Sequence, residues 1–156
     1  MELKDYQRYS EITRGLKKSE LVLKNAKIVN VFTGEIIEGD LAIEDGIIVG
    51  IGSYEGKTER DMSGKYICPG FIDSHLHLES TLVTPAELVT VASRHGTTTF
   101  IVDPHESANV SGLAGIDYIL EQTEDVKANV YVMMPSCVPA TGIDDNGCAL
   151  TAQDMA

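Results

Sequence analysis

The sequence has 156 residues, of which 43% are hydrophobic and 23% charged, a balance typical of a soluble globular protein that can bury a core. Its formal net charge is -12, and because no basic cluster is longer than Lys17-Lys18, DNA and RNA are poor partners whereas free nucleobases are not excluded. The three cysteines form no disulfide or metal pattern, and no apolar stretch approaches the roughly 18 residues of a membrane helix, so the sequence predicts a cytoplasmic protein without a membrane partner.

Residues 1–18 predict a short amphipathic helix, because apolar residues recur among charged ones at helical spacing. Residues 19–66 change period and contain short β-forming runs. The turn pairs between these runs are Thr33-Gly34, Gly39-Asp40 and Asp45-Gly46. An Asp-Gly pair between two such runs predicts a tight hairpin. This region therefore predicts a small antiparallel β unit, with too few strands to close a sandwich by itself.

Residues 67–156 alternate between strand and helix patterns. Strands are expected at 71–78, 97–102 and 130–134, and helices at 85–94 and 113–122. The first helix has Thr84 as its N-cap, Pro85 at its first position and Glu87 as the partner in a capping box. The alternation predicts a parallel α/β sheet or barrel. Because a closed barrel needs eight βα units, these three predict a truncated fragment or a chain completed by another polypeptide.

His75 and His77 are candidate metal ligands on the first of these strands. Side chains two residues apart on a strand point to the same side, so the two imidazoles project together, with Asp73 and Glu79 in line. Two such histidines can also be simply solvated. Only four histidines occur in the chain and two acids share this side, which favours metal binding.

The ends of the other two strands also carry reactive side chains. Functional groups of βα proteins gather at the carboxyl ends of strands. Asp103, His105 and Glu106 follow the second strand, and Ser136 and Cys137 follow the third. Two histidines with carboxylates suit Zn²⁺, Mn²⁺ or Fe²⁺, ions that activate water for attack on an electrophilic carbon.

Each of these residues also has an ordinary structural interpretation. Glu106 is placed to cap the helix that follows, and Asp103 can belong to a strand-to-loop turn. His105 and Glu106 would point in opposite directions on an extended backbone, so both are ligands only if the chain bends there. For Ser136 and Glu79 a substrate contact competes with loop structure and with a solvated acid, respectively.

Several segments together carry a family resemblance. Residues 69–77, P-G-F-I-D-S-H-L-H, preceded by a small β unit, are similar to the start of an amidohydrolase-superfamily enzyme. Residues 103–110, D-P-H-E-S-A-N-V, and 134–141, M-P-S-C-V-P-A-T, resemble the adenine deaminases in particular. The resemblance runs from about residue 19 to the end.

The resemblance implies a (β/α)₈ barrel with a β-sandwich built from segments on both sides of it. It implies a binuclear centre of divalent metal, manganese first with iron or zinc as alternatives, that hydrolyses adenine to hypoxanthine and ammonia; a homo-oligomer is expected at full length. His75 and His77 match the first-strand ligands and Glu106 the second-strand acid, an additional or bridging ligand.

The later-strand histidines and the proton-shuttling aspartate of the family are expected beyond Ala156, so the fragment alone is expected to be inactive. Two other interpretations remain: a dihydroorotase-like hydrolase of a cyclic amide, and a non-catalytic fragment or assembly partner that supplies half a barrel.

Overall fold

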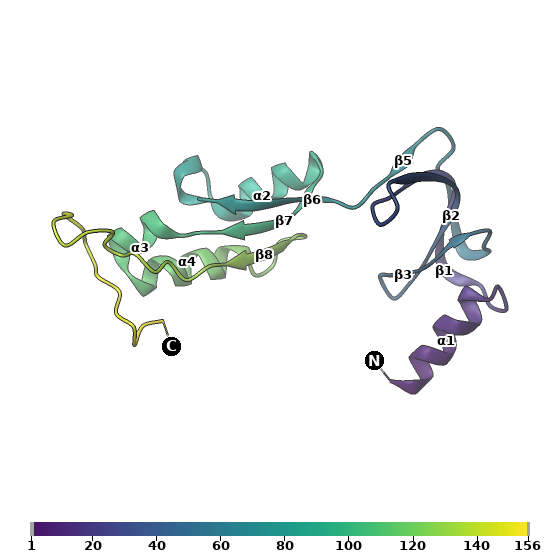
Figure 1. Ribbon diagram of the computed structural model, residues 1–156, viewed down its shortest axis with the longest axis horizontal. Coiled ribbons are helices and arrows are strands. Elements are labelled where there is room, and N and C mark those ends of the chain that lie inside the picture. The colour runs from purple at the N-terminus through teal and green to yellow at the C-terminus, as the bar shows by residue number, and fades with distance from the viewer. Residues whose placement is uncertain (1, 156) are drawn as a thin grey trace. The chain divides into compact units, whose positions relative to one another are not determined.

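The computed structural model describes residues 2–155 and divides the chain into two compact units, Met1–Pro69 and Gly70–Ala156 (Figure 1). Each unit has its own sheet and its own apolar cluster, centred on Ile28 and Leu41 in the first and on Phe100 and Val102 in the second. Among the described residues, no helix has both the length and the apolar character needed to cross a membrane.

The first unit is a mixed sheet preceded by a helix. Its elements are α1 (Leu3–Thr13), β1 (Ser19–Asn30), β2 (Glu35–Glu44), β3 (Ile47–Gly52), β4 (Gly56–Asp61) and β5 (Tyr66–Ile67). The strand order is β3-β2-β1-β4, and β5 also pairs with β1. The β1–β2 and β2–β3 pairs are antiparallel, but β4 and β5 run parallel to β1. The prediction of a purely antiparallel unit is therefore wrong, because the chain crosses from β3 to the far side of β1 before it pairs again.

Strand β2 continues through Gly39-Asp40, so the turn predicted at this pair is wrong. The Asp40 carboxylate is buried and accepts hydrogen bonds from Lys24 Nζ at 2.6 Å and from the backbone N–H groups of Asn25 and Tyr54, both at 3.1 Å. Asn25 has a φ of 58° at an irregularity of β1. Asp40 thus stabilises a bulge, and its polarity signals this local role rather than the end of a strand.

Helix α1 packs beside the hairpin formed by β2 and β3. Asp45 and Gly46 have φ values of 51° and 73°, which is the left-handed conformation that the predicted Asp-Gly hairpin requires. The Asp45 carboxylate accepts hydrogen bonds from Arg8 and from the Tyr9 hydroxyl. Ile12 is 1% exposed, so the helix contributes an apolar side chain to the interior of this unit.

The second unit is a parallel sheet of order β6-β7-β8 with helices in the connections (Figure 1). Its elements are β6 (Phe71–Leu76), the short 3₁₀-helix η1 (Glu79–Thr81), α2 (Pro85–Arg94), β7 (Thr97–Val102), α3 (His105–Ser111), α4 (Leu113–Thr123) and β8 (Asn129–Val132). Phe100 and Val102 of β7 pack with Val89 of α2 and Ile119 of α4. The helices therefore cover the face of β7 that carries these two side chains.

Two helix starts differ from the prediction. Thr84 occupies the N-cap position of α2 with an extended backbone, but its side chain makes no capping hydrogen bond. The segment after Pro104, which lies outside the helices expected at 85–94 and 113–122, forms the additional helix α3 (His105–Ser111). This helix supplies the bend that the neighbouring His105 and Glu106 would need to serve different partners.

Candidate metal centre

His75 and His77 converge at the carboxyl end of β6. The strand ends at Leu76, so His77 lies just beyond it rather than inside it as predicted. Leu76 and Leu78 pack into the core under the helices, and the alternating side chains His75 and His77 project away from that core. Their Nε2 atoms are 3.1 Å apart, and their rings meet edge to face with centroids at 4.9 Å.

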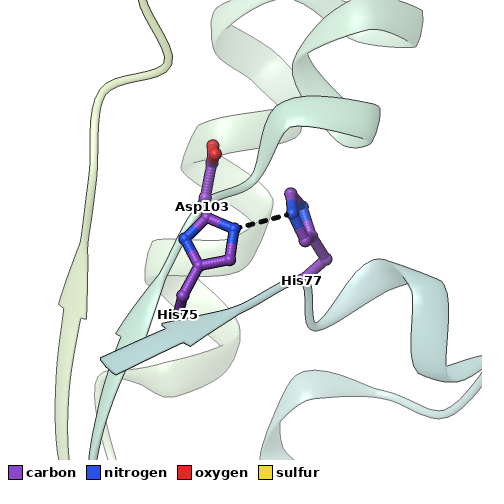
Figure 2. A group of neighbouring side chains, drawn as sticks. All are labelled: His75, His77 and Asp103. Carbon is purple, nitrogen blue, oxygen red and sulfur yellow. Dashed lines mark hydrogen bonds between the residues drawn. The ribbon is translucent and has the colours of Figure 1, made fainter. Parts of the chain in front are cut away.

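Asp103 adds a carboxylate to the two imidazoles. It follows the last residue of β7, and its backbone N–H donates to the carbonyl oxygen of Leu76 at 2.9 Å, which fixes it beside the end of β6. Potential ligand atoms of His75, His77 and Asp103 all lie within 4.8 Å of one another. Figure 2 shows the three side chains grouped at the ends of the two strands.

Glu79 and Glu106 form a second group of donors with His77. Their potential ligand atoms also lie within 4.8 Å of one another. Glu106 lies in the first turn of α3, with one carboxylate oxygen 3.8 Å from His77 Nδ1 and 2.6 Å from the Ser80 hydroxyl that donates to it. Glu79 Oε1 accepts the backbone N–H groups of Glu106 and Ser107 at 3.0 and 3.2 Å.

The donor set fits a divalent transition metal. Two ligands about 2.0–2.1 Å from one ion, at tetrahedral or octahedral angles, are roughly 2.9–3.4 Å apart, which includes the spacing of the two Nε2 atoms. Among residues 2–155, His77 Nδ1, Glu79 Oε2 and Asp103 Oδ1 are buried polar atoms without a hydrogen-bond partner. Buried polar atoms of native proteins normally have a protein, water or ligand partner, so three unpaired atoms in one cluster mark a place where ordered water or a ligand binds.

The remaining candidates lie outside these two groups. His105 turns toward the third strand's loop, where its Nδ1 is 3.6 Å from Cys137 Sγ. Ser136 is exposed on that loop, and its hydroxyl makes no hydrogen bond with the described residues. The bend into α3 therefore separates His105 from its neighbour Glu106, which faces His77.

Asp103 is the donor that the sequence left undecided between a site and a turn. Its position at the end of a predicted strand was the available signal. What the sequence did not give is the pairing of Leu76 with Val102, which brings the next residue of β7 beside the histidines. Geometry rather than residue type thus adds Asp103 to the cluster.

Comparisons with known proteins show the family of the chain. The profile of the amidohydrolase family matches residues 66–154. The chain is 58% identical over 152 residues to the adenine deaminase of Desulfitobacterium hafniense (strain Y51), covering 97% of this chain and 27% of that protein. It is 55% identical over 141 residues to the adenine deaminase of Clostridium acetobutylicum, covering 90% of this chain and 25% of that protein.

A solved structure shares the fold. The chain matches an N-acyl-D-glutamate deacylase from Bordetella bronchiseptica, crystallised with zinc and a phosphonate inhibitor, with a TM-score of 0.57 and 20% identity over 88% of this chain and 34% of that one. The chain spans about a quarter of the length of the adenine deaminases that it matches. Since the family profile covers more than half of its residues, including the histidines and carboxylates of the cluster, this chain belongs to the amidohydrolase family.

Proposed function

We propose that the protein is a metal-dependent hydrolase that deaminates adenine to hypoxanthine and ammonia. The observation that carries the proposal is the cluster of His75, His77, Asp103 and Glu106 at the ends of β6 and β7, in a chain 58% identical to an adenine deaminase. The reaction breaks the bond between C6 of adenine and its amino nitrogen and forms a bond from C6 to a water oxygen.

His75 and His77 would bind the metal through their Nε2 atoms, and Asp103 would add a carboxylate oxygen. Glu106, beside His77 Nδ1, would serve as a further carboxylate ligand. A divalent ion held by these groups supplies a Lewis acid that activates water at neutral pH. The chain's own part is to hold its donors at fixed places, through the β6–β7 pairing and the start of α3.

Among the ions, we assign Mn²⁺ to the site, in a centre of more than one ion. Carboxylates and imidazoles are ligands that suit Mn²⁺ as well as Fe²⁺ and Zn²⁺. The two donor groups supply separate carboxylates, Asp103 in one and Glu106 in the other, and this supports more than one ion. Measuring metal per chain after loading with each ion separately tests both assignments.

The second unit is proposed to be part of a (β/α)₈ barrel, and residues 19–66 part of a β-sandwich. The parallel order β6-β7-β8 with helical connections supports the barrel, because parallel neighbours joined by helices are its repeating element. The likeness to the deacylase supports the same fold class.

The activity is tested on the protein at its full encoded length, stripped of metal with a chelator and reloaded with Mn²⁺. Adenine should release ammonia, and His75→Ala and His77→Ala should each lower kcat/KM by at least about 100-fold, since even outer partners of metal ligands cost about 10–100-fold. Asp103→Ala should also lower kcat/KM. His95→Ala is the matched control. His95 is exposed and is the C-cap of α2, so it precedes β7, whereas Asp103 follows the carboxyl end of that strand.

Two outcomes would overturn the proposal. Unchanged ammonia release in both histidine variants would contradict the assignment of His75 and His77 as metal ligands. Turnover of a dihydroorotate-like cyclic amide, with adenine left unreacted, would keep the metal centre and replace the substrate.

A further inference from the structure

The short segment Glu79-Ser80, which directly follows the histidines, holds the beginning of α3. Glu79 Oε1 accepts the N–H groups of Glu106 and Ser107 at 3.0 and 3.2 Å. The Ser80 hydroxyl donates to the Glu106 carboxylate at 2.6 Å. The segment therefore binds both the backbone and the side chain of Glu106.

Helix α3 has no capping side chain next to its own start. Its N-cap residue is Pro104, which makes no side-chain capping hydrogen bond. The first N–H groups of a helix lack partners inside the helix and are normally satisfied by a nearby Ser, Thr, Asp or Asn. Here the acceptor comes from Glu79, which lies 27 residues before Glu106 in the sequence.

Glu79 itself is held in place. Its neighbour Leu78 is fully buried in the core cluster of the second unit, and Glu79 is only partly exposed. Glu79 Oε2 is buried without a hydrogen-bond partner among the described residues and faces the cluster shared with His77 and Glu106. Oε1 of Glu79 thus accepts hydrogen bonds from the α3 backbone. Neither a substrate contact nor a fully solvated acid would account for these two hydrogen bonds.

We propose that Glu79 is a positioning residue: by accepting the first N–H groups of α3 it sets Glu106 against His77 and thereby raises the affinity of the metal centre. The inference rests on the proposed metal centre but not on adenine as the substrate. It makes Glu79 an outer partner of a ligand, a type of residue whose loss typically costs about 10–100-fold in metal affinity.

The test compares Glu79→Gln with Glu79→Ala in the protein at its full encoded length. The glutamine carbonyl oxygen can still accept both N–H groups, whereas alanine cannot. Binding of Mn²⁺ alone is measured from the electron paramagnetic resonance signal of the free ion. Glu79→Ala should weaken Mn²⁺ binding about 10-fold, and Glu79→Gln should stay within about 3-fold of the wild type. Glu121→Ala, an exposed acid on α4, is the matched control.

Hydrogen exchange of the Glu106 and Ser107 amides gives a second readout that needs no metal. The exchange should accelerate about 5- to 10-fold in Glu79→Ala, the loss typical of a helix cap, and stay near the wild-type rate in Glu79→Gln. Ser80→Ala, which leaves the backbone contacts of Glu79, should weaken Mn²⁺ binding without accelerating these amides.

Three results would overturn the proposal. Equal losses of Mn²⁺ affinity in Glu79→Gln and Glu79→Ala would make the carboxylate charge, as a ligand, the important property. Unchanged affinity in Glu79→Ala would remove the positioning role. If Glu79→Ala does not fold by circular dichroism, the amides of Glu79→Gln decide: retained protection supports the cap, and lost protection rejects it. A failure of adenine turnover alone would leave all of these results unaffected.

Discussion

Three side-chain atoms near the histidines are buried without a partner among residues 2–155: His77 Nδ1, Glu79 Oε2 and Asp103 Oδ1. Each such atom costs about 1–3 kcal/mol of stability when it is left unpaired. A cluster that was only structural would replace them with apolar side chains at a gain in stability. A metal ion bound by His75 and His77 would satisfy the open lone pair of Asp103 Oδ1, which explains the cost of burying that oxygen.

Asp40, in the first unit, shows the opposite arrangement for a buried carboxylate. Burial by itself raises the pKa of the Asp40 carboxyl, but hydrogen bonds from Lys24 and from the backbone N–H groups of Tyr54 and Asn25 bring its pKa below the ordinary value. Its side chain is 8% exposed and its charge is fully matched by donors. We interpret Asp40 as a structural residue of the β1 bulge.

This lowered pKa predicts how the stability of the first unit depends on pH. Because the folded pKa lies below the unfolded one, the contribution of Asp40 is fully present above the unfolded pKa, near 4, and is lost as the pH falls through the folded pKa. Asp40→Asn should remove this acid-dependent part and lower the free energy of unfolding at pH 7 by about 1–3 kcal/mol. Urea unfolding between pH 7 and 2 measures both effects.

Glu38→Gln provides the control for this prediction. Glu38 is an exposed acid on the same strand, so its substitution should change the free energy of unfolding at pH 7 by less than about 0.5 kcal/mol. Identical acid dependence in wild type and Asp40→Asn would contradict the role assigned to the Asp40 carboxylate.

At the scale of elements, the sequence predicted the helices and strands that are specified by neighbouring residues, through turn pairs or hydrophobic spacing. Asp45-Gly46 gives the hairpin, and the alternation of periods gives β6, α2, β7, α4 and β8. Strand β4 has no such signal: five of its six residues are exposed, and it is held by backbone pairing with β1. Helix α3 was not predicted because its first N–H groups are satisfied by Glu79, far away in the sequence.

The same distinction applies to the candidate site. His75 and His77 were found from their spacing of two, a local property of a strand. Asp103 and the Glu79 contacts depend on the β6–β7 pairing and on the start of α3, which are long-range features. A single sequence carries no signal for such pairings beyond the expectation that polar strand ends meet.

The packing of α3 against α4 depends on Gly115. A Cβ at this position would lie 2.4 Å from the carbonyl oxygen of Ser107, a backbone atom that cannot move away by itself. Gly115→Ala should therefore lower the free energy of unfolding of the second unit by about 1–3 kcal/mol, despite the higher helix propensity of alanine. Because Ser107 donates to Glu79, Mn²⁺ binding should weaken as well.

Thermal unfolding followed by circular dichroism, together with Mn²⁺ titration, measures both consequences. Gly142→Ala is the control, since nothing lies within 4 Å of a Cβ built there. A Gly115→Ala protein as stable as Gly142→Ala would contradict the close approach of the two helices.

At the scale of the whole molecule, two opposing properties govern association of the 156-residue chain. The outer strands of the second sheet are β6 and β8, and large apolar side chains on and beside them are exposed: Phe71 by 65%, Ile72 by 64% and Tyr131 by 60%. Exposed strand edges promote pairing between copies. The net charge of -12 opposes this pairing through repulsion between copies, and salt screens that repulsion.

The balance predicts association that increases with salt. At about 0.01 M salt the screening length is about 30 Å, so the charged chains should repel one another and remain monomeric; at about 1 M it is about 3 Å, and the sheet edges should pair. Sedimentation velocity at equal protein concentration measures the change. Tyr131→Lys on β8 should reduce the association at high salt, because a charge on an edge strand disfavours pairing. Tyr118→Lys, the same substitution on exposed α4, should not, so equal effects of the two substitutions would refute pairing through the β8 edge.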